Sequence, residues 1–232
     1  LEKIKKRLIQ IKPRVLIYEG FMYKYHPQIK KILDLINDNE IGEIKKIVSS
    51  FGINLLTKKN FWFFKKKKKI DKENRLFNKK LGGGSILDLG CYPVSLITML
   101  LEKFRFVNFK DYKVLNKKVE IGETGVDIDS KIEMKVNGTI SIELSSSFKQ
   151  NIGTATAIYG SKGSIEILNT WSGSSNIILK KDNNKDIIRF NEIDDIYFDQ
   201  LNMISNDLLN KNIGQNLDNM LLNMKIIDQW LN

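Results

Sequence analysis

The sequence has only one cysteine and one histidine among its 232 residues. A disulfide needs two cysteines, so Cys91 excludes an intrachain disulfide and favours a reducing, cytoplasmic location. Cys91 and His26 are also too few for a zinc site built from Cys and His ligands within one chain. We therefore predict no metal site. Hydrophobic residues make up 42% of the chain and charged residues 28%, which is typical of a globular protein rather than a disordered one.

Arginine is scarce too, although the formal net charge is +11. Only five of the 38 basic residues are arginine, whereas nucleic-acid-binding surfaces favour arginine for its bidentate and stacking contacts. Five consecutive lysines at residues 65–69 follow the aromatic run FWFF and resemble a nucleic-acid patch. We interpret them as a solvated loop and predict no nucleic-acid partner; a basic nucleic-acid binder remains the weakest alternative.

The first residues lack the continuous apolar segment of a signal peptide or a membrane span. We therefore predict no membrane partner. The chain opens with Leu1 rather than Met. We expect it to begin inside a longer polypeptide.

Apolar periodicity predicts helices first and strands later. Pro13 closes the first helix, and residues 57–80 form a long basic connection without clear periodicity. This order predicts an α+β fold with a meandering antiparallel sheet. We expect helices at residues 1–11, 28–42, 85–103, 198–210 and 217–231, and strands at 15–21, 43–55, 126–136, 140–148, 153–160, 164–168, 176–180 and 186–190.

The hairpin around Asn137-Gly138 has a testable register, because the apolar residues of both strands are even-numbered. A two-residue loop would place the two apolar sets on opposite faces, so we predict a three-residue turn with Gly138 in the left-handed conformation. The predicted cross-strand pairs are Met134 with Ile140 and Ile132 with Ile142.

The stretch LGGGSILDLGCYPVS, residues 81–95, holds the main candidate site. Its glycines fit neither a P-loop nor a GxGxxG dinucleotide motif, but they permit close backbone approach, and Ser85 can cap the helix that follows. Asp88 and Tyr92 share one face if this segment is helical. Spacing alone leaves two interpretations open: a proton-transferring pair, or a solvated carboxylate beside a core aromatic.

Two other polar features are interpreted as structural. His26 precedes Pro27 at a junction between elements. Asp127 and Asp129 alternate with apolar residues, which predicts a solvated strand face rather than a metal site.

Two stretches carry a resemblance to a known family: EGFMYKYHPQIKKILDLINDNEIGEIKKIVSSFG, residues 19–52, and NRLFNKKLGGGSILDLGCYPVS, residues 74–95. They resemble the glucose–fructose oxidoreductase and inositol dehydrogenase (Gfo/Idh/MocA) family, and the second most resembles its dihydrodiol dehydrogenase and D-xylose dehydrogenase branch. IYGSKGSIEI and the closing helices also match the family.

The resemblance implies an open, predominantly antiparallel sheet with helices on one face, preceded in the family by a Rossmann domain that binds NAD or NADP. Tyr92 would exchange a proton with the hydroxyl of a sugar or cyclic trans-diol while hydride moves between substrate and nicotinamide. Asp88 would line the substrate pocket, and Arg75 would assist. The family's open sheet face implies a homo-oligomer.

The sequence departs from the family because the glycine-rich cofactor loop and the Glu-Lys-Pro motif are absent. We expect residues 1–20 to be the remnant of the dinucleotide-binding domain and crossover, and residues 21–232 to be the C-terminal substrate and oligomerisation domain. By itself the chain is expected to be inactive. The alternative is a non-catalytic dimerisation module or a decayed relative.

Overall fold

The structure is a computed structural model that describes residues 17–59, 65–103, 112–172, 176–190, 195–210 and 217–232, together with residues 3, 6 and 7. It confirms the predicted α+β class. In the described part of the chain, eight strands form one sheet in which only the β1–β6 pair is parallel. Their spatial order is β10 (Asn184–Ile188), β9 (Ile177–Lys181), β8 (Gly163–Ile167), β7 (Thr156–Gly160), β1 (Ile44–Gly52), β6 (Ile140–Ser147), β5 (Asp127–Val136) and β4 (Tyr112–Ile121).

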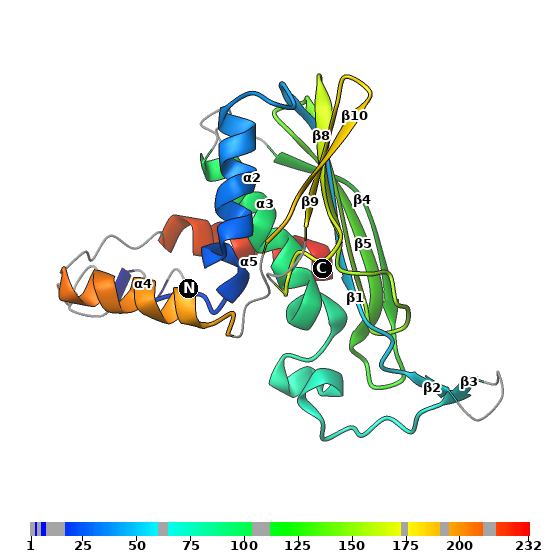
Figure 1. The fold of residues 1–232 in the computed structure, drawn as a ribbon. Helices are drawn as coiled ribbons and strands as arrows, with labels where there is room; N and C mark the ends of the chain where they lie inside the picture. The colour runs from blue at the N-terminus through cyan, green and yellow to red at the C-terminus, as the bar shows by residue number, and fades with distance from the viewer. Residues whose placement is uncertain are drawn as a thin grey trace.

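The helices lie on one side of this sheet (Figure 1). The longest helical segment joins a π-helical turn, Ile86–Gly90, directly to α3, Cys91–Lys103. Helices α2 (Pro27–Asn37) and α5 (Leu217–Leu231) flank α3, and α4 (Phe198–Leu209) extends away from the sheet (Figure 1). Short 3-10 turns cover Met22–Tyr25, Arg75–Phe77 and Lys79–Leu81.

Strand alternation separates an apolar face from a charged one. Ile47, Ile132 and Ile142 are fully or almost fully buried in the cluster that also contains Ile97 and Leu100 of α3. Alternate side chains point to opposite faces of a strand, so their neighbours form the uncovered face. The sheet therefore has one face that packs against the helices and one without helices.

The charged side chains of the uncovered face pair with one another. Lys131 bridges Glu133 at 2.9 Å and Glu143 at 3.1 Å. Lys180 contacts Glu166 at 2.6 Å. Because these pairs are partly solvated, they set the charge pattern of the face more than they stabilise it.

The register around Gly138 is partly as predicted. Val136 pairs with Ile140 across a three-residue turn, and Gly138 has φ +66°. The predicted cross-strand pairs are wrong: Met134 faces Ile142 and Ile132 faces Leu144. Because Val136 lies opposite Ile140, the observed partners of Met134 and Ile132 lie two residues further along β6 than the predicted ones. A shift by an even number of residues keeps the apolar side chains on the same face.

Several predicted elements are corrected by the structure. Residues 17–21 are not a strand, because Tyr18 bonds Asp207 on α4 and Phe21 packs against Tyr92. Helix α2 stops at Asn37, before two residues with positive φ, Asn39 and Gly42. Most of the helix predicted at residues 1–11 lies outside the described residues.

The lysine-rich connection contains more structure than predicted. Strand β2 (Thr57–Lys59) pairs with β3 (Lys65–Lys67), so the start of the lysine run is a strand rather than a loop. Strand β4 was not assigned from the sequence at all, because lysines and Asn116 interrupt its apolar alternation.

Among the described residues, one helical stretch, Lys79–Lys103, is long and apolar enough by composition to cross a membrane. Inside the protein 72% of its most apolar window is buried. That burial is typical of a core helix.

His26 has the structural role that its position suggested. Its side chain is 2% exposed, and its Nδ1 accepts the backbone N–H of Gln28 at 2.9 Å, which caps α2. Pro27 occupies the first turn, where no N–H is needed. Burial lowers the pKa of His26 from its ordinary value of 6.5, an effect that Asp199 partly opposes.

This cap predicts an acid-sensitive stability. Since the folded state holds the pKa of His26 below its unfolded value, the unfolded chain binds more protons as the pH falls below 6.5. The free energy of unfolding should then fall by up to about 1.4 kcal/mol per pH unit. Urea unfolding between pH 7.5 and 5 measures this loss.

His26→Asn is the matched control, because asparagine keeps a capping acceptor but does not titrate. His26 is the only histidine in the chain. A plot of the free energy of unfolding against pH should therefore have a smaller slope between pH 6.5 and 5 in the variant. Equal slopes in both proteins would contradict the role assigned to His26.

Candidate active site

Three glycines form the joint that leads into α3. A Cβ on Gly83 would lie 2.6 Å from the Arg75 carbonyl oxygen, and a Cβ on Gly84 would collide with Asp127 Oδ1. Gly82 and Gly84 also have φ values of +74° and +124°. Only glycine meets both demands, which confirms the prediction of a close-approach joint.

The joint brings Arg75 to Asp88. The Gly83 N–H donates to Asn78 O at 3.0 Å, and the Gly84 N–H donates to Leu76 O at 3.0 Å. These bonds fix the turn that carries Arg75 beside the π-helical turn. Arg75 Nη1 then donates to Asp88 Oδ1 at 2.7 Å. Two of the three predicted site residues are thus in direct contact.

Tyr92 follows Asp88 by four residues, at the start of α3. The charge of Asp88 raises the pKa of Tyr92 and that of Arg75 lowers it, so both act on the phenol. Among the described residues, none forms a hydrogen bond with the Tyr92 hydroxyl. The structure therefore places Arg75, Asp88 and Tyr92 in one locality, with the phenol available to a ligand.

An aromatic cluster surrounds the Tyr92 ring. Ring-centroid distances from Tyr92 are 5.3 Å to Phe21, 6.0 Å to Tyr23, 5.3 Å to Phe51 and 5.8 Å to Trp171. Three of these contacts are edge-on, the arrangement that aromatic pairs prefer. The cluster fixes the ring and raises the pKa of Tyr92, chiefly through burial.

Sequence reasoning missed these aromatics because they come from distant parts of the chain. Phe51 is the penultimate residue of β1, and Trp171 follows β8 and donates its indole N–H to Ser50 O at 3.1 Å. Tyr197, just before α4, also acts on Tyr92 and raises its pKa. No local spacing predicts such a cluster.

Cys91 is a poor nucleophile despite its place beside Tyr92. Burial, with a further contribution from Asp88, raises the pKa of its thiol to about 12. A thiol with such a pKa stays protonated at neutral pH. The carboxyl group of Asp88 and the phenol of Tyr92 therefore remain the candidate reactive groups of this segment.

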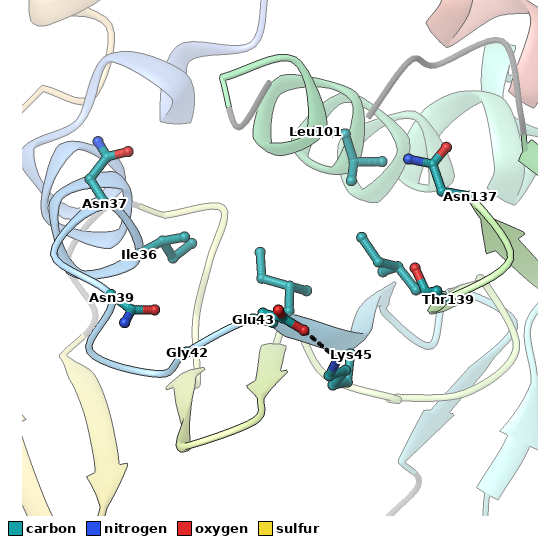
Figure 2. Close-up of a pocket in the computed structure, with 11 residues that line it drawn as sticks. Ile36, Asn37, Asn39, Gly42, Glu43, Lys45, Leu101, Asn137 and Thr139 are labelled. Atoms are coloured by element: carbon teal, nitrogen blue, oxygen red, sulfur yellow. Dashed lines mark hydrogen bonds and ion pairs between the residues drawn. The ribbon is translucent and has the colours of Figure 1, made fainter. Parts of the chain in front are cut away.

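A separate pocket of about 490 Å³ lies at the other end of α3 (Figure 2). Its lining includes Ile36, Leu101, Asn37, Asn137 and the ion pair Glu43–Lys45. Leu101 lies nine residues beyond Tyr92, or about 14 Å along the helix. This pocket contains none of the predicted site residues.

No cluster of three or more His, Cys, Asp or Glu side chains suited to a metal ion occurs in the part of the chain that the structure describes. The acidic and cationic groups at the site are the paired Asp88 and Arg75. Together with the Tyr92 phenol, these are the groups through which the described part of the site could hold a charge or transfer a proton.

The family model for the GFO/IDH/MocA C-terminal domain matches residues 29–166. This chain belongs to the GFO/IDH/MocA family. The matched range contains the glycine joint, Asp88, Tyr92 and the central strands. The resemblance that residues 19–52 and 74–95 indicated is thereby confirmed.

Relatives in this family include dehydrogenases and reductases. The chain is 30% identical over 174 residues to trans-1,2-dihydrobenzene-1,2-diol dehydrogenase of Xenopus tropicalis, covering 75% of this chain and 46% of that protein. It is 25% identical over 161 residues to the NADP-dependent D-xylose 1-dehydrogenase of Hypocrea jecorina, covering 66% and 40%. The chain thus spans about half the length of the curated relatives it matches.

Solved structures of the family share the fold. A 3-ketoreductase from Actinomadura kijaniata, in complex with NADP and TDP-benzene, superposes with a TM-score of 0.77 at 16% identity, covering 96% of this chain and 64% of that one. An aldose-aldose oxidoreductase from Caulobacter crescentus, complexed with glycerol, gives a TM-score of 0.71 at 15% identity, covering 91% and 59%. The predicted fold of a GFO/IDH/MocA C-terminal domain is confirmed.

The glycine joint of this GFO/IDH/MocA domain yields a stability prediction. Gly84→Ala should lower the free energy of unfolding by more than Gly125→Ala does. Both glycines have positive φ, but nothing lies within 4 Å of a Cβ on Gly125. That control should cost about 1–2 kcal/mol of backbone strain, whereas Gly84→Ala adds the collision with Asp127. Urea unfolding compares the two, and equal losses would contradict the close approach.

Proposed function

We propose that this chain is the C-terminal, substrate-binding domain of an NAD(P)-dependent oxidoreductase acting on CH–OH groups. The substrate would be a secondary alcohol or hemiacetal of a sugar or cyclic trans-diol, as the names of the relatives suggest. Tyr92 would exchange the proton of the substrate oxygen. Asp88 and Arg75 would bind and orient the substrate.

The observation that carries this proposal is that the paired Asp88 and Arg75 both influence the pKa of the Tyr92 phenol, whose hydroxyl forms no hydrogen bond with any described residue. A hydroxyl group without a partner in the protein can form a hydrogen bond with an oxygen of a ligand. Because burial raises the pKa of Tyr92, the phenol is protonated at neutral pH. It is therefore suited to donate a proton to a carbonyl oxygen in the direction of reduction.

In the opposite direction Tyr92 would have to accept a proton, which requires a nearby positive charge. Arg75 supplies one, since it lowers the pKa of the phenol. The Arg75 side chain is 71% exposed, so solvent weakens its effect. A second positive charge, from outside this chain, would lower the pKa of Tyr92 further and allow the phenol to act as a base.

NADP or NAD would accept or donate the hydride when bound. The residues present fit the substrate end of such a site and not the dinucleotide, because the chain contains no GxGxxG loop to hold the phosphates. We assign the cofactor mainly to a separate dinucleotide-binding domain. Residues 1–20 would be the end of that domain and its crossover, and residues 21–232 would be the substrate and oligomerisation domain, inactive alone and located in the cytoplasm.

The uncovered sheet face is the proposed contact with a second copy of the chain. The register places Ile187 beside Ile178, and Val48 beside Ala157. Tyr159, also on this face, is 41% exposed. Glu166 lies between the two apolar pairs, and a mixture of apolar and polar side chains is compatible with a homodimer interface.

The catalytic proposal predicts the effect of Tyr92→Phe. In the chain together with its dinucleotide-binding domain, kcat should fall by about 10²–10⁴-fold, because the proton donor is lost while the ring and its aromatic contacts remain. Tyr159→Phe, on the open face, is the control. Unchanged turnover in Tyr92→Phe would contradict the role of the phenol and favour a non-catalytic module.

The oligomer proposal predicts the effect of Ile178→Lys. Ile178 lies between Ile187 and Glu166, one strand from the sheet edge. A lysine buried there in the proposed interface should convert the dimer to a monomer, because an unpaired buried charge is strongly unfavourable. Leu209→Lys, at an 80% exposed position on α4, is the control. Sedimentation equilibrium measures both, and a dimer that survives in Ile178→Lys would place the interface elsewhere.

A further inference from the structure

We propose that Asp127 is a positioning residue that holds the helix bearing Asp88 and Tyr92 against the sheet. Asp127 begins β5, far from that helix in sequence. Its role in fixing the helix rests on geometry alone. Its effect on catalysis rests on the function proposed above.

Asp127 supplies the cap that the helix lacks. Its Oδ2 accepts the Ser85 hydroxyl at 2.7 Å and the Ile86 backbone N–H at 2.7 Å. Ser85 has helical φ and ψ and makes no side-chain cap of its own. The cap predicted for Ser85 is therefore wrong, and a side chain from the sheet takes that place.

The prediction that Asp127 lies on a solvated face is wrong as well. Its side chain is 3% exposed, because the start of β5 lies beneath the glycine joint. Oδ1 lies so close to Gly84 that no Cβ fits there. The two oxygens thus define the position of both the joint and the first N–H of the helix.

A second strand strengthens this contact. The Ser85 hydroxyl lies 3.1 Å from Ser146 Oγ on β6, and Ser146 is fully buried. Gly90, one turn further, would place a Cβ 3.3 Å from Ser146 Cβ. The sheet therefore contacts the π-helical turn at both of its ends.

The site residues follow directly from this anchor. The Asp88 N–H donates to Gly84 O at 3.1 Å, so the joint sets the position of Asp88. Tyr92 lies one turn beyond, inside its aromatic cluster. A change at Ser85 or Ile86 would shift both groups relative to a substrate, and a misplacement of about 1 Å is costly in catalysis.

Hydrogen exchange of the chain itself tests the anchor. In Asp127→Ala, Ser85 and Ile86 lose their acceptor, so exchange in residues 85–92 should accelerate at least about tenfold. Exchange in β6 and β7 should stay unchanged. Asp127→Asn keeps one acceptor oxygen and should stay within about threefold of the parent chain.

Asp129→Ala is the matched control. A register shift separates Asp129 from Asp127 on the same strand, and Asp129 lies beside Lys131 of the uncovered face. Ser85→Ala removes one of the two bonds and should give an intermediate effect, so it replaces Asp127→Ala if that variant does not fold. Unchanged exchange in residues 85–92 would overturn the proposal. An equal acceleration throughout the sheet would also overturn it, because it would assign Asp127 a general stabilising role.

Turnover with the dinucleotide-binding domain tests the catalytic part. Asp127→Ala should lower kcat/KM at least about tenfold and Asp127→Asn should restore it. The alkaline limb of the pH profile should shift downward in Asp127→Ala, because Tyr92 would leave the surroundings that raise its pKa. An unchanged limb and rate would refute positioning. No turnover in the parent protein would refute the proposed function, while the exchange result would still decide the anchor.

Discussion

The close approach of one helix to the centre of the sheet is the constraint on which the rest of the structure depends. Gly84 lies against Asp127, and Gly90 lies against Trp230 and Ser146. Gly84 has no room for a side chain and a Cβ on Gly90 would lie only 3.0 Å from Trp230 Cζ3, so the helix sits at a fixed height and rotation on strands β5 and β6. That placement presents Asp88 to Arg75 and turns Tyr92 into the aromatic cluster. Sheet, joint and site thus form one unit.

The surroundings of Tyr92 suit the proton transfer of the proposed reaction but not the binding of the cofactor. Burial among aromatic rings raises the pKa of Tyr92 and keeps the phenol protonated at neutral pH, and the Asp88–Arg75 pair supplies charges of both signs. The sequence contains no GxGxxG loop of the kind that holds the phosphates of a dinucleotide. The matched family model describes a C-terminal domain, and the aligned part of the chain covers 46% of the dihydrodiol dehydrogenase of Xenopus tropicalis. A separate cofactor-binding domain, as proposed above, would explain this division.

Local pattern was sufficient for much of the fold. Even-numbered apolar residues placed β5 and β6, and Gly138 set their turn. Strand β4 was not predicted, because Asn116, Lys117 and Lys118 interrupt its alternation of apolar and polar residues at a sheet edge where few side chains are buried. Segment 17–21 looked like a strand because it is apolar, but its partners are helices and aromatic rings rather than strands.

The candidate site, like the fold, could be predicted from the sequence only in part. Asp88 and Tyr92 lie four residues apart and share one motif, so the sequence indicated both. Asp127, Trp171 and Tyr197 reach the site only through the tertiary fold, and no spacing relates them to Tyr92. The sequence pattern even predicted a solvated side chain for Asp127, because strand alternation cannot show that a helix terminus lies above that residue.

The central claim is that hydride moves between a substrate carbon and nicotinamide at the Tyr92 site. The most direct measurement follows deuterium from C1-deuterated D-xylose, or from a carbinol-deuterated cyclic trans-diol, to NADP or NAD. The protein would be the chain together with its dinucleotide-binding domain, and mass spectrometry would analyse the cofactor. The account predicts one deuterium in the reduced cofactor with at least one of these substrates. Cofactor that binds to the folded protein but acquires no deuterium from either class would contradict it.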